Sequence, residues 1–141
     1  MLLVGRALGV DYGTKRIGYA LSDEMGWAAE PLEVWTKKSL EEDLVHLVAL
    51  VTGHEVRRVV IGVPNRLDGT EGPEAKRALE WAEAVRAVSP VPIETRDEAL
   101  TTWAAEERMR ERGLSPKDRK KWVDAYAAAV ILQEDLDARR P

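Results

Sequence analysis

The chain has 141 residues, of which 45% are hydrophobic, so it is long enough to bury one core and is not an intrinsically disordered chain. The absence of cysteine excludes a disulfide framework and a thiolate metal site, and the two histidines, His46 and His54, do not have zinc-site spacing. No stretch approaches the ~20 apolar residues of a membrane span, so we expect a single cytoplasmic domain over residues 1–141.

The first half of the chain is expected to form three strands and one helix. Strands are predicted at residues 3–10, 16–22 and 31–35, with turn-forming residues between the first two. A helix is expected to begin after Ser39, because Glu42 three residues later completes a capping box. The apolar stripe of this helix consists of Leu40, Leu44, Leu47, Val48 and Val51.

The second half is expected to alternate strands and helices. Strands are predicted at residues 58–63 and 91–95, and helices at 73–88, from Thr101 or Thr102 to about 112, and from about 120 to 136. This order predicts an α/β fold, a mixed five-stranded sheet with helices on both faces. Sites in such sheets gather beyond the carboxyl ends of strands, where Asp11, the 64–72 loop and Glu98 are expected.

Three carboxylates from distant segments are candidate metal ligands. Asp11 ends the first strand, although Asp also commonly opens turns. Glu98 follows a strand and precedes a helix, where an acid also favours the helix dipole. Asp124 interrupts an apolar helical run, with a first-turn acid on the dipole as the alternative. Together, three hard oxygen ligands suit Mg²⁺ or Mn²⁺.

Basic residues near these acids are candidate phosphate contacts. Lys15 and Arg16 follow Asp11, and the bare backbone of Gly9 and Gly13 would leave room for a phosphate or ion. Residues 108–121 include seven basic and two acidic residues, a footprint for a nucleic acid backbone or a solvated helix end. Five tryptophans are able to stack on bases, but the sequence singles out none of them.

Four segments together resemble the motifs of the YqgF/RuvX family. They are residues 8–18, 60–64 with 68–73, 97–102, and 123–129, and they span nearly the whole chain in the family's order. The resemblance implies a ribonuclease H-like fold related to the Holliday junction resolvase RuvC, and metal-ligand roles for Asp11, Glu98 and Asp124. It implies a nuclease that processes the 5′ end of pre-16S ribosomal RNA, with junction resolution as an older proposal. The family usually has Arg where this chain has Ala99, so Arg96 or the basic segment would have to replace it.

The sequence therefore predicts a Mg²⁺- or Mn²⁺-dependent nuclease that acts on an rRNA precursor, with the ribosome as a further partner. Its predicted phosphate-binding residues are Lys15, Arg16, Arg66 and Arg96. One alternative is a resolvase of four-way DNA, which needs a dimer for paired cuts. A non-catalytic RNA-binding module is another. A phosphate-binding ATPase lobe is a third, because Asp-x-Gly-Thr also marks actin-like kinases, but these need a second lobe.

Overall fold

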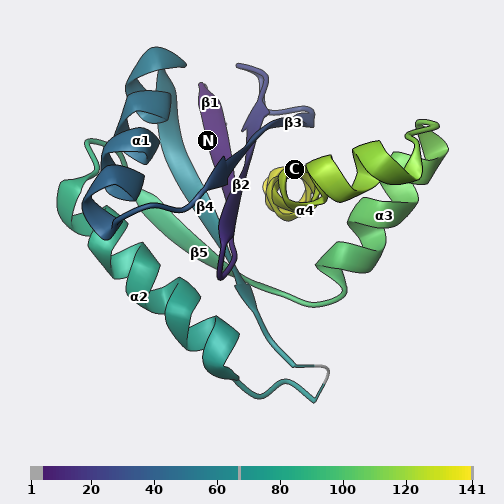
Figure 1. Ribbon diagram of the computed structural model, residues 1–141. Helices are drawn as coiled ribbons and strands as arrows, with labels where there is room; N and C mark the ends of the chain where they lie inside the picture. Colours follow the sequence, from purple (N-terminus) through teal and green to yellow (C-terminus); the bar gives the residue numbers. More distant parts are fainter. Residues whose placement is uncertain (1–4, 67, 141) are drawn as a thin grey trace.

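The computed structural model describes residues 5–66 and 68–140, and a five-stranded mixed sheet lies at its centre (Figure 1). The strands are β1 (Arg6–Tyr12), β2 (Arg16–Ser22), β3 (Ala29–Thr36), β4 (Val56–Pro64) and β5 (Ile93–Glu98). They lie in the order β3-β2-β1-β4-β5. The pairs β1–β2 and β2–β3 are antiparallel, and β1–β4 and β4–β5 are parallel. The predicted mixed sheet is confirmed.

Helices cover both faces of this sheet, as predicted. They are α1 (Leu40–Gly53), α2 (Pro73–Val88), α3 (Thr101–Glu111) and α4 (Pro116–Ala138). Helices α1 and α2 bury one face around Leu47, Trp81 and Ile61, and α4 buries the other with α3 packed on its outer side (Figure 1). Over the described ranges 5–66 and 68–140, no helix has both the length and the apolar character of a membrane span.

Two glycines bring α4 unusually close to the sheet. A Cβ at Gly18 in β2 would lie 1.9 Å from the backbone carbonyl oxygen of Asp124, and one at Gly9 in β1 would lie 2.7 Å from that of Ala128. The expectation that Gly9 leaves room for a phosphate or ion is wrong, because the backbone of α4 fills that space. Gly13 instead closes the β1–β2 turn, where its N–H donates to the Arg16 carbonyl at 2.9 Å.

Several element boundaries differ from the prediction. Strand β1 continues to Tyr12, which places Asp11 inside the strand, and residues 3–4 of the predicted strand lie outside the described residues. Strand β5 runs to Glu98 rather than to residue 95, because parallel pairing with β4 satisfies its polar backbone. Helix α4 begins at Pro116 rather than near residue 120, since Ser115 caps it by accepting the Asp118 N–H at 3.2 Å.

The helix starts give one confirmation and two corrections. Ser39 caps α1 by accepting the Glu42 N–H at 3.1 Å, as predicted. In the first turn of α1, however, Asp43 takes the inward position and Leu40 is exposed. Neither Thr101 nor Thr102 caps α3. The N-cap is Leu100, which adopts a left-handed conformation with φ of 58° and makes no side-chain cap bond.

Candidate active site

The three predicted carboxylates lie at one edge of the sheet, where the parallel strands end. Asp11 is the penultimate residue of β1 and Glu98 is the last residue of β5, and both line one cavity of about 300 Å³. Asp124 comes from α4, where its backbone covers Gly18, and Gly18 pairs with Asp11 in the β1–β2 register. Asp124 lies well beyond the first turn of α4, so a dipole role for it is excluded.

The surroundings of Asp11 and Glu98 disfavour the ionised form of each carboxyl. Burial, followed by repulsion from Asp124, raises the pKa of Asp11 to about 7. Burial and contact with the Glu134 carboxyl raise the pKa of Glu98 to about 8, and Arg96 opposes the shift. Glu98 is 5% exposed, and its Oε1 atom has no hydrogen-bond partner among the described residues. A bound cation would lower the free energy of both ionised carboxylates.

The donor set fits a hard divalent cation, although the side chains are not arranged as a finished cluster. Across residues 5–66 and 68–140, no three acidic or imidazole side chains converge at ligand distance. Asp11 nevertheless shares a cavity with Glu98 and faces the charge of Asp124. Carboxylates from three elements and a buried oxygen without a hydrogen bond are what Mg²⁺ or Mn²⁺ would bind.

Two predicted phosphate-binding arginines lie against the acids themselves. The Arg16 side chain donates from Nε to Asp124 Oδ2 at 2.9 Å and is half-exposed. The Nε atom of Arg96 lies 3.3 Å from Glu98 Oε1, but the two are not aligned for a hydrogen bond. Each arginine therefore holds positive charge at the site and can turn toward a bound phosphate. The sequence did not predict that they would pair with the acids.

The other two predicted phosphate contacts lie farther out. Lys15 is exposed in the β1–β2 turn, next to the site. Arg66 is exposed in the loop after β4, and its guanidinium lies against Gly72 at the start of α2. An isolated bridge between Asn65 and Glu71 folds this loop back on itself. Neither Lys15 nor Arg66 lines the cavity of Asp11 and Glu98.

The basic segment 108–121 contains residues that support the fold and residues that make no ion pair with the described part of the chain. Four of its arginines support the α3–α4 hairpin. Arg108 and Arg112 form ion pairs with Glu30, and Arg110 pairs with acids of α3. Arg119 donates to the Leu114 carbonyl. In the described part of the chain, no ion pair involves Lys117, Lys120 or Lys121. Their spacing puts them on the face of α4 that carries Asp124. They form a basic stripe that leads to the site.

Sequence reasoning missed three neighbours of Glu98. Glu134 on α4 contacts its carboxyl, and Thr101 donates to Glu98 Oε2 at 3.4 Å. Trp103 lines the cavity and is 63% exposed. The helical spacing from Asp124 through Ile131 to Glu134 was a usable signal for the first, because Ile131 also lines the cavity. Only the tertiary structure identifies the other two.

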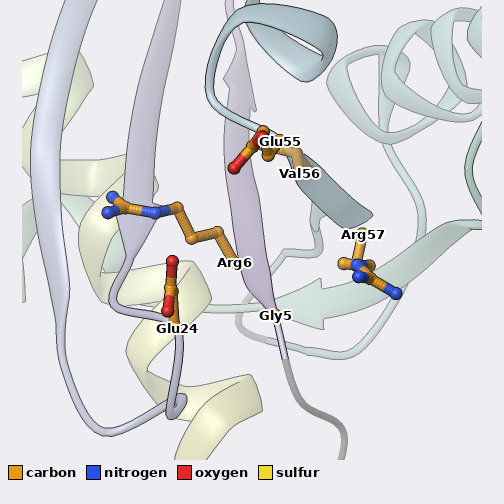
Figure 2. Close-up of a pocket in the computed structure, with 6 residues that line it drawn as sticks. All are labelled: Gly5, Arg6, Glu24, Glu55, Val56 and Arg57. Carbon is orange, nitrogen blue, oxygen red and sulfur yellow. The ribbon is translucent and has the colours of Figure 1, made fainter.

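A second cavity lies at the opposite end of the sheet. It measures about 390 Å³ and is lined by Gly5, Arg6, Glu24, Glu55, Val56 and Arg57 (Figure 2). It adjoins the amino ends of β1 and β4, whereas sites in open sheets lie at the carboxyl ends. Its two arginines and two glutamates balance in charge, so the cavity of Asp11 and Glu98 is the stronger candidate for the active site.

Comparisons with known proteins identify the family of the chain. The model of the RuvX family, described as Holliday junction resolvase, matches residues 5–138. A protein of Anaeromyxobacter dehalogenans is 44% identical over 96% of this chain and 99% of its own, and one of Halalkalibacterium halodurans is 43% identical over 96% and 98%. Both carry the name "Putative pre-16S rRNA nuclease".

Solved structures show the same fold at low identity. RuvC of T. thermophilus, solved with a Holliday junction substrate, matches with a TM-score of 0.61 and 18% identity over 95% of this chain and 94% of that chain. A manganese-soaked human cytomegalovirus terminase nuclease domain matches with a TM-score of 0.51 and 14% identity over 95% and 84%. The ribonuclease H-like architecture predicted from the sequence is confirmed. The family match over nearly the whole chain, the relatives and the shared fold lead to one conclusion: the chain belongs to the RuvX family.

Proposed function

We propose that residues 1–141 act as one metal-dependent nuclease domain that hydrolyses phosphodiester bonds of a ribosomal RNA precursor, at the 5′ end of 16S rRNA, in the cytoplasm. The observation that carries the proposal is the shared cavity of Asp11 and Glu98, with Asp124 beside Asp11 and a buried Glu98 oxygen that has no hydrogen-bond partner among the described residues. The names of the close relatives support the choice of substrate.

In this proposal, Asp11, Glu98 and Asp124 hold Mg²⁺ or Mn²⁺. When bound, these ions supply an activated water and stabilise the leaving oxygen. The residues of the chain do the rest. Arg16 leaves Asp124 and contacts a substrate phosphate, with Lys15 beside it in the same turn. Arg96 supplies charge near Glu98 in place of the arginine that the family usually has at position 99.

The lysines of α4 that have no ion pair among the described residues would guide the nucleic acid strand toward the carboxylates. A strand carries one phosphate per nucleotide, and an acidic site alone would repel it. The basic stripe of Lys117, Lys120 and Lys121 offsets that repulsion along α4. The net charge of −4 is therefore compatible with nucleic acid binding, because the positive charge is concentrated next to the site.

The test is cleavage of two labelled substrates with Mg²⁺: a pre-16S 5′ leader RNA and a four-way DNA junction. Asp11→Asn and Glu98→Gln are expected to abolish cleavage of the RNA. Asp97→Asn is the matched control, since Asp97 is the exposed neighbour of Glu98 on β5. This variant is expected to cleave the RNA like wild type. Paired cuts in the junction alone would instead favour a resolvase. If wild type binds the RNA but cuts neither substrate, the chain is a binding module.

A further inference from the structure

An exposed aromatic side chain stands at the mouth of the carboxylate cavity. Trp103, in the first turn of α3, lines the same cavity as Asp11 and Glu98 and is 63% exposed. Large aromatic residues lose favourable burial when they face water, so such exposure beside a polar site marks a surface that a ligand covers. The surroundings of Trp103 indicate the kind of ligand.

The other four tryptophans already have partners. Trp81 stacks on Tyr12 at a centroid distance of 4.8 Å, and Trp35 stacks on His46 at 3.7 Å. Trp122 packs between α3 and α4. Trp27 is 62% exposed, but the Arg140 guanidinium lies 4.7 Å from its ring centroid. Within residues 5–66 and 68–140, no ring stacking or cation–π contact involves Trp103, and most of its surface is exposed.

Leu100 adds a second apolar group to this edge of the cavity. It is 63% exposed, lines the cavity, and caps α3 with φ of 58°. A left-handed leucine is strained, and its side chain neither caps the helix nor fills the core. Backbone strain of this kind is retained where the side chain has another contact to make. Leu100 and Trp103 together form an apolar platform beside the carboxylates.

We propose that this platform stacks an unpaired base of the nucleotide next to the phosphate that is cut, so the site takes single-stranded or locally unpaired nucleic acid rather than a continuous duplex. This inference rests on the proposed function, because it assumes that a nucleic acid enters the cavity. Every base has a π-face that stacks on tryptophan, but in a duplex its paired neighbours cover that face. Stacking also supplies binding energy that the carboxylates, which repel phosphates, do not supply.

The experiment measures binding without divalent metal, so that cleavage plays no part. A labelled single-stranded RNA and the same RNA annealed to its complement are titrated with wild type, Trp103→Ala, Trp103→Phe and Trp27→Ala. Trp27 is the matched control, because it is as exposed as Trp103 but lies in the β2–β3 connection at the far end of the sheet. A 2-aminopurine placed at successive positions reports stacking through loss of its fluorescence.

Trp103→Ala is expected to weaken single-strand binding by about 5- to 150-fold, the range expected for one stacked base, and to abolish the fluorescence loss at one position. Trp103→Phe is expected to restore most of both, and Trp27→Ala to match wild type. Duplex binding is expected to be the same in all four proteins. Unchanged single-strand binding by Trp103→Ala would overturn the proposal, as would an equal loss for the duplex.

The two proposals fail in different ways. If wild type stacks 2-aminopurine through Trp103 but never cleaves, the platform stands and the nuclease proposal falls. If cleavage depends on Asp11 while Trp103→Ala binds and cleaves single strands like wild type, only the platform is refuted. Since Trp103 is mostly exposed, the alanine variant is expected to fold, which its thermal unfolding would verify.

Discussion

Replacing Gly18 with alanine tests whether the close approach of α4 to the sheet positions the site. The new Cβ would lie 1.9 Å from the Asp124 carbonyl oxygen and 2.8 Å from the Ala125 nitrogen. Both are backbone atoms, which no side-chain rotation moves. To reach ordinary contact at 3.4 Å, the helix has to withdraw by about 1.5 Å at the residue that carries a proposed metal ligand.

The expected loss of stability follows from this overlap. Overpacking a filled core costs about 1–3 kcal/mol in the free energy of unfolding, and more where rigid backbone has to move. For a chain of this length, each kcal/mol lowers Tm by about 3–4 °C. We expect Gly18→Ala to lower Tm by about 3–12 °C. The cleavage rate should also fall, because a misplacement of about 1 Å at a reacting centre can reduce the rate by about 100-fold.

The matched control is Gly53→Ala at the end of α1, where a Cβ meets no atom within 4 Å. The same chemical change there is expected to leave cleavage unchanged and to raise the unfolding free energy by up to about 1 kcal/mol, since alanine favours a helix over glycine. Thermal unfolding and cleavage rates of both variants are the assays. A Gly18→Ala protein as stable and active as wild type would refute the account of α4.

Three further changes test the charges and the strain of the fold. The Asp11 carboxyl keeps its proton up to about pH 7 in the folded chain but loses it near pH 4 when unfolded, so its contribution to stability is present below pH 4 and is lost as the pH rises to 7. Without metal, Asp11→Asn should therefore be more stable than wild type at pH 8, by roughly 2–4 kcal/mol, and less sensitive to pH in calorimetry. Adding Mg²⁺ at about 100 times its Kd should stabilise wild type alone, by about 2.7 kcal/mol, and equal stabilisation of the variant would contradict the metal site. Asp135→Ala removes the 2.6 Å partner of buried Arg58 and should cost about 3–5 kcal/mol in urea unfolding, against little change for exposed Asp137→Ala. Leu100→Gly should relieve left-handed strain and leave the unfolding free energy unchanged or up to about 1 kcal/mol higher, while single-strand affinity falls; a large loss of stability would show that Leu100 is structural.

The sheet and most helices could be predicted from local sequence patterns, but the position of Glu98 in the site could not. Apolar runs and turn formers located all five strands, and the capping box at Ser39 located the start of α1. The end of β5 was harder, because residues 94–98 are polar. Their strand conformation comes from pairing with β4, a partner far away in the chain. Tertiary pairing therefore decided where Glu98 lies.

The start of α4 shows a signal that was present but not used. Ser115, followed by Pro116 and then Asp118, is an N-cap pattern with proline in the first turn. Gly113, Ser115 and Pro116 are also typical helix breakers, and the sequence prediction placed the start beyond them, near residue 120. With the helix beginning at Pro116, four residues earlier than expected, Asp124 lies beyond its first turn and the dipole alternative disappears. A local capping pattern thus bears directly on the interpretation of a candidate ligand.

Charge pairing is the part of the site that the sequence least reveals. Arg16 and Asp124 are far apart in the chain, yet an ion pair joins them at the sheet edge. Arg108 and Arg112 looked equally suited to a phosphate, but Glu30 on β3 engages both. The difference lies in geometry, because Arg108 and Arg112 of α3 reach Glu30 at the start of β3. Lys117, Lys120 and Lys121 lie on an exposed face of α4. Counting basic residues located the right region, and only the fold separates those that hold the protein together from those that remain free for a nucleic acid.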